Sequence, residues 1–286
     1  MRVKPVFFES AGIAGLQHEG EIPVMALHGW LDNAGSFTGL ADHLAGINLV
    51  AVDFPGHGLS RARPEGARYY FDDYVFDVLT IADALGWKQF HLLGHSLGGA
   101  VASLVGAAAP DRVVSMTLIE GLGPISAPAD RTASGWRKAV KASRLRTRKV
   151  HVNREAAVSA RASNSDLTVA EAGILAERGL KSDDGGFRWS HDQRLTWPST
   201  HRYTEAQVLD LLKAIKAPVL NIYSDPPSGI LPARILERRL AALGQRRLFS
   251  HPGGHHLHMQ HPAVIGPVIK EFFHEHKARV AQEHSD

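Results

Sequence analysis

Short apolar runs recur along the chain, and polar loops or stretches with apolar residues at helical spacing separate them. The apolar runs predict strands at residues 3–8, 13–18, 22–27, 48–54, 90–93, 113–119, 218–223 and 246–249. The helical spacing predicts helices at residues 71–85, 100–109, 205–214, 231–243 and 262–274. Strands that alternate with helices form parallel βαβ units. We therefore predict an α/β fold whose mostly parallel eight-stranded sheet is flanked by helices and opens with an antiparallel pair.

The pattern changes between residues 125 and 201, where helix formers and basic residues replace the strand signals. This stretch predicts a helical cap inserted into the α/β protein. The expected division is a core of residues 1–124 and 202–286 and a cap of residues 125–201.

One predicted strand runs directly into a G-x-S-x-G turn, which reads Gly94-His95-Ser96-Leu97-Gly98, and a small-residue helix follows. In a strand–turn–helix of this kind the serine backbone is strained, and the flanking glycines let neighbouring elements approach closely. The turn would hold the Ser96 hydroxyl at the carboxyl edge of the sheet. The amide of Leu97, at the helix start, would point to the group that the hydroxyl attacks. Because the motif also arises by chance, the prediction depends on whether its partners are present.

Candidate partners follow other predicted strands. His28-Gly29-Trp30 comes after the strand at 22–27, and this turn could bring the amide of Trp30 beside that of Leu97 to make two donors for an oxyanion. Taken alone, the segment would indicate a loop glycine and a structural histidine. Glu120 ends the strand at 113–119 and precedes glycine, which places it at the sheet edge where ligands bind.

Four segments, in order, resemble the α/β-hydrolase fold family across nearly the whole chain. They are H-G-W, D-F-P-G-H-G-L-S, G-H-S-L-G-G and P-G-G-H-H-L-H-M. D-Q-R-L at Asp192 to Leu195, together with the histidine-rich terminal segment, looks most like the serine-hydrolase-like branch. The resemblance implies a catalytic triad with Ser96 as the nucleophile and a late histidine as the base.

The resemblance implies His255 as the base, because it follows Gly253-Gly254 as the family's catalytic histidine does. His256 and His258 are the alternatives, and the H-H-x-H spacing also admits a zinc site, although no third ligand can be assigned to it. His28 and His95 are expected to be structural.

The triad acid departs from the family's commoner pattern. Many members carry it after the strand that here is 218–223, where this chain has Asp225 earlier than expected. Other members, some haloalkane dehalogenases among them, place it where this chain has Glu120. We favour Glu120 over Asp225, for which the alternative is a turn or cap carboxylate.

The amino-acid composition limits which kinds of site, cellular location and binding partner the protein can have. The chain has 286 residues, no cysteine and a formal net charge of +3. Disulfides, zinc–thiolate sites and cysteine nucleophiles are therefore excluded, and we expect neither a cofactor nor a metal. With no apolar leader and no spanning run, the chain is expected to be soluble and cytoplasmic, without stable membrane insertion. The small net charge and the lack of interleaved aromatic residues argue against nucleic-acid binding.

The predicted cap contains a basic segment, residues 131–161, in which the only acid is Glu155. Its cations are Arg131, Arg137, Lys138, Lys141, Arg144, Arg146, Arg148, Lys149, Arg154 and Arg161. They could recognise an anionic acyl donor such as a coenzyme A thioester, or a membrane surface, but a solvated helix face is the favoured interpretation. Trp136, Trp189 and Trp197 are candidates for an acyl pocket or for simple packing.

The expected function is a serine hydrolase of the carboxylesterase or thioesterase type that forms an acyl-enzyme on Ser96. Its substrate would be a small-molecule acyl ester or thioester, and the sequence is compatible with a homodimer. Carbon–carbon bond hydrolysis and perhydrolysis use the same triad. Dehalogenation is disfavoured, because it needs a carboxylate nucleophile. The rival from another class is a non-catalytic ligand-binding protein that kept the fold.

Overall fold

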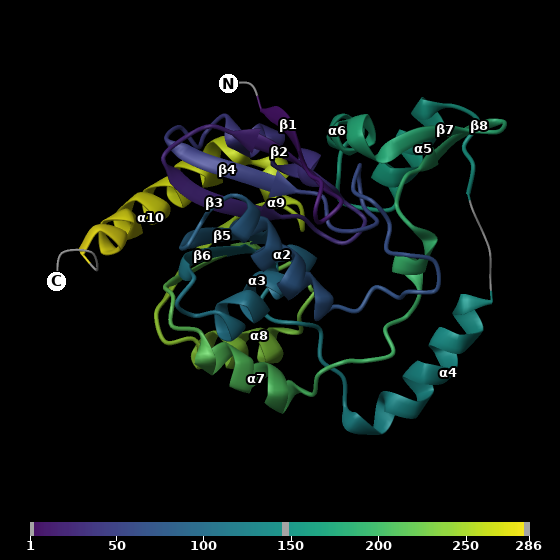
Figure 1. Ribbon diagram of the computed structural model, residues 1–286. Helices are drawn as coiled ribbons and strands as arrows, with labels where there is room; N and C mark the ends of the chain where they lie inside the picture. The colour runs from purple at the N-terminus through teal and green to yellow at the C-terminus, as the bar shows by residue number, and fades with distance from the viewer. Residues whose placement is uncertain (1–2, 145–148, 283–286) are drawn as a thin grey trace.

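The computed structural model describes residues 3–144 and 149–282, and its centre is an eight-stranded sheet in the order β1-β2-β4-β3-β5-β6-β9-β10 (Figure 1). The strands are β1 (Lys4–Phe8), β2 (Ile13–His18), β3 (Ile22–Leu27), β4 (Ile47–Val52), β5 (Phe90–His95), β6 (Val113–Ile119), β9 (Val219–Ser224) and β10 (Arg246–His251). Strands β1 and β2 pair antiparallel with each other and β2 pairs antiparallel with β4, whereas every later pairing is parallel. The predicted α/β fold and its opening antiparallel pair are confirmed.

Helices cover both faces of the sheet. They are α1 (Thr38–Ala41), α2 (Asp73–Ala84), α3 (Leu97–Ala108), α7 (Glu205–Ala214), α8 (Ala233–Ala242), α9 (Leu257–Gln260) and α10 (Pro262–Gln282), with the 3₁₀ turn η1 (Ala34–Phe37). Side chains alternate along a strand, so Met25 and Leu27 of β3 join the core under α2, α3 and α7, while Val24 and Ala26 join the core under α1 and α10. The central strands β3, β4, β5, β6 and β9 are thus buried on both faces, as their continuous apolar runs predict.

The chain leaves this sheet after β6 and rejoins it at α7. The excursion contains η2 (Ala129–Arg131), α4 (Thr132–Ser143), α5 (Arg154–Ser163), α6 (Val169–Gly179), β7 (Leu180–Asp183), β8 (Gly186–Trp189) and η3 (Gln193–Thr196). We call residues 125–201 the cap segment; its independence as a domain stays a prediction. The sequence did not indicate the hairpin of β7 and β8, whose tight turn carries Gly185 at φ +80°.

The two parts of the cap segment pack differently. Helices α5 and α6 pack against each other through Val158, Ala172 and Leu175, and Asn33 beside η1 donates a hydrogen bond to the Leu175 carbonyl over 2.9 Å. Helix α4, by contrast, stands apart from α5 and α6 in Figure 1 and leaves Trp136 half exposed. The α5–α6 part is therefore built into the protein beside η1, and the segment around η3 is joined to the core by the hydrogen bond from the Asp192 amide to the Gly56 carbonyl.

Candidate active site

Ser96 lies in the turn between β5 and α3 with φ 51° and ψ −110°, a strained conformation for a residue that has a Cβ atom. The turn persists because its surroundings fix it: the Ser96 amide donates to the Ile119 carbonyl over 2.9 Å. A Cβ atom on Gly98 would lie 1.9 Å from the Leu27 carbonyl oxygen, and one on Gly94 would lie 2.5 Å from the Gly98 carbonyl oxygen. The two glycines of the motif are therefore required for α3 to pack this closely on the sheet.

Backbone strain gathers at this edge of the sheet. In the described parts of the chain, the non-glycine residues with positive φ are Leu31, Ser96 and Glu120. Each follows the carboxyl end of one of three adjacent strands, β3, β5 and β6. Strained residues persist where the surrounding structure determines them, and they cluster at functional sites. This edge is therefore the candidate active site.

The His-Gly-Trp turn is tied to the start of α3, because the His28 carbonyl accepts a hydrogen bond from the Gly98 amide over 3.1 Å. In the described parts of the chain, the amides of Trp30 and Leu97 donate to no protein acceptor. They are therefore available to an oxyanion. The buried His28 side chain donates from Nδ1 to the Gly29 carbonyl (2.7 Å) and accepts from the Phe54 amide at Nε2 (3.0 Å), so it links the ends of β3 and β4.

The structure brings Glu120, and not Asp225, to His255. Glu120 Oε2 lies 3.6 Å from His255 Nδ1, whereas Asp225 is exposed on the loop after β9. That loop serves Glu120 in another way: the Ser224 amide donates to Oε1 over 2.5 Å, and the Ser228 hydroxyl donates to Oε2. Burial raises the pKa of Glu120, but His255 and these donors outweigh it, so its pKa is below the usual value. Glu120 is thus a preformed carboxylate beside an imidazole.

His255 reaches the elbow through its backbone. Its carbonyl accepts a hydrogen bond from His95 Nε2 over 2.9 Å, and His95 directly precedes Ser96. The two rings lie 4.9 Å apart between centroids. No hydrogen bond joins the Ser96 hydroxyl to His255 within residues 3–144 and 149–282. The structure therefore places the acid of the predicted triad beside the imidazole. Within the described residues it contains no hydrogen bond between the serine and the imidazole.

A second polar cluster, which sequence reasoning missed, lies behind this histidine. Buried His256 binds Asp166 of the cap segment through Nδ1, and its Nε2 lies 3.4 Å from Asp32 Oδ2. Arg161 of α5 donates to Asp32 Oδ1 over 2.6 Å, and His95 Nδ1 lies 3.6 Å from Oδ2. We call Asp32, Arg161, Asp166 and His256 the anchor cluster. One sequence signal points to it, an aspartate two residues after His-Gly-Trp.

The anchor cluster holds its charges in place. Burial lowers the pKa of His256, but the hydrogen bonds to Asp166 and Asp32 prevail and raise it to about 9. Burial raises the pKa of Asp32, and contacts with His256, His95 and Arg161 carry it well below its usual value. His256 is therefore a cation at neutral pH, held between two carboxylates, one from the cap segment and one from the core.

The remaining histidines of the terminal segment do not converge on a metal site. His258 is fully buried, and its ring packs on His95 (4.2 Å) and Phe37 (5.2 Å). Among the described residues, no group of three His, Asp or Glu side chains is arranged to hold an ion. Within the same residues no helix is long and apolar enough to cross a membrane.

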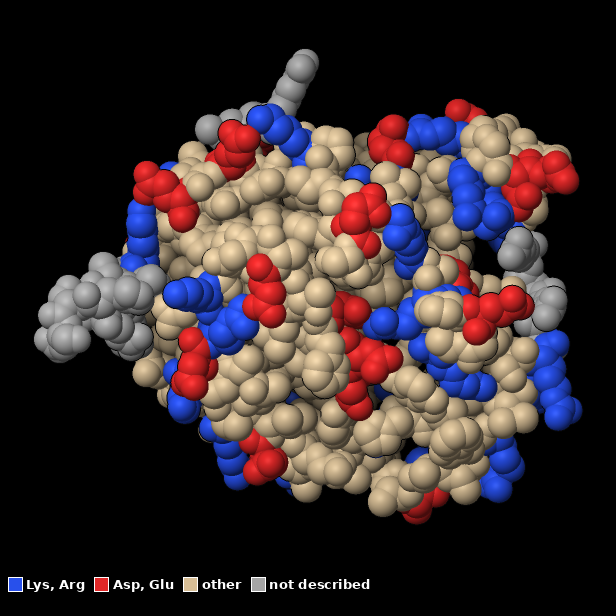
Figure 2. Space-filling model, viewed as in Figure 1, with Lys and Arg blue, Asp and Glu red and all other residues tan. Residues whose placement is uncertain are grey.

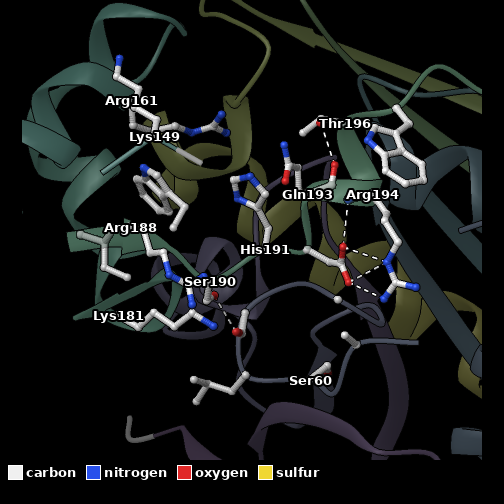
Figure 3. Close-up of a pocket in the computed structure, with 18 of the residues that line it drawn as sticks. Ser60, Lys149, Arg161, Lys181, Arg188, Ser190, His191, Gln193, Arg194 and Thr196 are labelled. Carbon is white, nitrogen blue, oxygen red and sulfur yellow. Dashed lines mark hydrogen bonds and ion pairs between the residues drawn. The ribbon is translucent and has the colours of Figure 1, made fainter. Parts of the chain in front are cut away.

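A cavity of about 1590 Å³ lies beside the candidate active site, between the cap segment and the loop at residues 56–68 (Figure 3). Neither Ser96 nor His255 is among its lining residues. It is joined to the strained turn after β3, because the Trp30 indole donates to the Leu195 carbonyl over 3.1 Å and Leu195 sits between two lining residues, Arg194 and Thr196. Trp189 and Trp197 line the cavity, whereas Trp136 does not.

Comparison with known proteins agrees with this architecture. Residues 22–262 match the model of the alpha/beta hydrolase fold. A serine hydrolase-like protein of Dictyostelium discoideum is 34% identical over 275 residues, which cover 91% of this chain and 77% of that protein. A serine hydrolase-like protein of Danio rerio is 33% identical over 263 residues, covering 87% of this chain and 81% of the relative.

Solved structures extend the likeness. A hypothetical protein of Pseudomonas aeruginosa PAO1 superposes with a TM-score of 0.87 at 37% identity, covering 96% of this chain and 99% of that one. The thioesterase domain from the curacin biosynthetic pathway has a TM-score of 0.82 at 24% identity, covering 94% and 99%, and shows the fold alone.

The chain belongs to the α/β-hydrolase fold family. Within that family its relatives place it in the serine-hydrolase-like branch. The resemblance inferred from the four sequence segments is thus confirmed.

Proposed function

We propose that the protein is a serine hydrolase that cleaves acyl esters or thioesters through an acyl-enzyme on Ser96. The observation that carries the proposal is the arrangement at one sheet edge: a serine on a strained elbow, two free amides beside it, and an imidazole 3.6 Å from a buried carboxylate. A protein that only binds a ligand has no need of strained residues at three adjacent strand ends.

The chemistry needs one local movement. The His255 ring packs on that of His95, next to Ser96, but no hydrogen bond joins it to Ser96 among the described residues, and catalytic hydrogen bonds often tighten only when substrate is bound. With substrate in place, His255 Nε2 takes the Ser96 proton while Glu120 holds Nδ1–H and stabilises the imidazolium. The serine oxygen forms a bond to the acyl carbon, the carbon–oxygen or carbon–sulfur bond breaks, and the proton passes to the leaving group. Water then attacks the acyl-enzyme by the same route and releases the acid.

The oxyanion is held by the amides of Trp30 and Leu97. A donor of this kind is worth about 3 kcal/mol of transition-state stabilisation when its geometry matches the developing charge. Strain at Leu31 supports this role for Trp30, because the positive φ turns the chain sharply just after its amide. Serine rather than carboxylate at the elbow favours acyl transfer over halide displacement.

Hydrolysis of p-nitrophenyl butyrate and labelling by a fluorophosphonate probe test the proposal together. The wild-type protein should turn over the ester and take up one label, and Ser96→Ala should do neither. Ser10→Ala, which changes an exposed serine in the turn between β1 and β2, is the matched control and should behave as wild type. Equal turnover by Ser96→Ala would remove Ser96 as the nucleophile. A folded wild-type protein that neither labels nor hydrolyses would instead favour the ligand-binding rival.

A further inference from the structure

The cavity beside the candidate active site is large and cationic. Pockets for small ligands usually have volumes of about 300–1,000 Å³, so a simple ester would fill only part of this one. Its cationic lining residues are Arg68, Lys149, Arg161, Lys181, Arg188 and Arg194, against the acids Glu65 and Asp192. Lys149, Arg161, Lys181 and Arg188 lie on one side of His191 in Figure 3, and Arg194 lies on the other.

These cations come from separate parts of the sequence. Only Lys149 and Arg161 belong to the basic segment at residues 131–161, whereas Arg68 comes from the loop before α2 and Lys181 and Arg188 from the β7–β8 hairpin. Figure 2 shows several Lys and Arg side chains, with Asp and Glu among them, on the side of the molecule that carries α4, α5 and β8. The fold has therefore concentrated positive charge in a concave wall, where a field acts more strongly than on an open surface.

Part of this charge is already compensated. Arg194 pairs with Asp192 over 2.6 Å, Arg188 pairs with Asp183, and Arg161 pairs with Asp32. Arg68 and Lys149 pair with no carboxylate in the described parts of the chain. The Arg68 guanidinium lies over the Trp197 ring, 5.3 Å from its centroid. An anion in the cavity would meet two cations that lack protein counter-charges.

The cavity also has two connections to the reacting groups. Arg161 lines it and holds Asp32, which contacts His95 next to Ser96. The Trp30 indole donates to the carbonyl of Leu195, which lies between the lining residues Arg194 and Thr196, and the Trp30 amide is an oxyanion donor in the mechanism above. Arg161 and Trp30 thus link the residues around the cavity to those around Ser96.

We propose that this cavity binds an oxyanion group of the substrate, a phosphate or a carboxylate, so that the enzyme acts on anionic acyl esters or thioesters. The choice of substrate rests on the proposed hydrolase function, whereas the binding of an anion in the cavity does not depend on it. Arg68 and Lys149 supply the attraction, and Trp189 and Trp197 contact the body to which the anionic group is attached.

The first experiment measures binding without catalysis, by calorimetric titration with inorganic pyrophosphate at low ionic strength. Wild-type protein should bind pyrophosphate at a saturable site, and Arg68→Gln/Lys149→Gln should bind it about tenfold more weakly. The matched control is Arg137→Gln/Lys138→Gln, which removes one Arg and one Lys from exposed positions on α4 outside the cavity. The control should bind as wild type. No saturable binding, or an equal loss in both double variants, would overturn the proposal.

The second experiment compares matched substrates. Butyryl-coenzyme A and butyryl-N-acetylcysteamine differ in a phosphate-bearing leaving group, and p-nitrophenyl hydrogen glutarate and p-nitrophenyl butyrate differ in a carboxylate on the acyl group. The cavity variant should raise KM for the anionic member of one pair about tenfold more than for its neutral partner. The pair that responds tells whether the leaving group or the acyl group carries the charge.

The outcomes separate the two proposals. If neither pair distinguishes the cavity variant from the α4 control, the cavity has no role in choosing substrate and the inference fails. If no substrate is hydrolysed but pyrophosphate binding remains sensitive to Arg68 and Lys149, the anion site stands and the hydrolase assignment fails.

Discussion

Two neighbouring histidines, His255 and His256, lie in different surroundings. His255 has one carboxylate 3.6 Å from Nδ1, and within the described residues its Nε2 makes no hydrogen bond. His256 is held between Asp166 and Asp32, and its raised pKa, about 9, keeps it charged. His255 thus lies beside one carboxylate, whereas His256 is held by two and gives up its proton only in alkali.

The difference shows how one short loop serves two purposes. An imidazole that acts as a base must lose and regain a proton, so it cannot be fixed by several strong partners. An imidazolium that holds two carboxylates contributes to structure because it does not lose its proton. Since the anchor cluster joins the cap segment to the core, His256 fixes the loop from which His255 operates. The comparison yields four predictions.

The largest expected difference is in the activity of the two variants in which one histidine is replaced. His255→Gln removes the base, and in a serine hydrolase loss of the base lowers kcat by about 10⁶-fold. His256→Gln should reduce kcat far less, because the base and carboxylate remain. Steady-state hydrolysis of p-nitrophenyl butyrate measures both. If His256→Gln proves the more damaging of the two, the base assignment moves to His256.

Replacing the two candidate acids, Glu120 and Asp225, should also have very different effects on kcat. Glu120→Gln keeps the size of the side chain but removes the charge that stabilises the imidazolium, and the expected loss in kcat is about 10⁴-fold. Asp225→Asn should leave kcat within about twofold of wild type, because Asp225 is exposed and Glu120 is the carboxylate that lies beside His255. The reverse ranking would return the acid to Asp225.

Stability should show the opposite ranking of the histidines. His256→Gln leaves Asp32 and Asp166 without their shared cation, and removing one partner from a buried ion pair costs about 3–5 kcal/mol. His255→Gln should cost less than about 1 kcal/mol, since the approach of the His255 ring to the Glu120 carboxylate is long, 3.6 Å. Urea unfolding followed by circular dichroism measures the free energy of unfolding, with His274→Gln, an exposed change on α10, as control. A loss in the control as large as in His256→Gln would mean that the anchor cluster contributes nothing special.

The centre of the sheet was predictable because its strands are nearly continuous apolar runs between turn residues, a pattern that burial on both faces requires. The strand at 113–119 was predicted with its observed bounds, whereas the strands ending at His95, Ser224 and His251 extend beyond their apolar runs. Pairing with neighbouring strands overrides the polarity of those last residues. The β7–β8 hairpin has no apolar run at all, so nothing in its residues distinguished it from a loop.

Some residues of the candidate site were predictable from the sequence, and others were not. Ser96, Trp30, Glu120 and Leu97 follow strand ends or open a helix, and local pattern places such residues at one edge. The anchor cluster could not be found this way, because Asp32, Arg161, Asp166 and His256 come from four separate segments that only the folded chain brings together. The same holds for Arg68 and Lys149 in the cavity.

The pH dependence of stability gives the smallest effect and the finest test of the comparison. Because the pKa of His256 is raised from 6.5 to about 9 in the folded protein, its contribution is complete below about pH 6.5 and is lost as the pH rises through 9. A shift of this size corresponds to about 3 kcal/mol. Asp32 has a lowered pKa, so its contribution is present above about pH 4 and does not change over this range.

The charged or titratable groups that face His256 are Asp32 from the core, Asp166 and Arg161 from the cap segment, and the rings of His95, His255 and His258. Tyrosines and lysines titrate at high pH as well, but they do so equally in wild type and in His256→Gln. The difference in unfolding free energy between these two proteins should therefore shrink by about 3 kcal/mol from pH 6 to pH 10, and a difference that stays constant would show that His256 carries no charge in the folded protein.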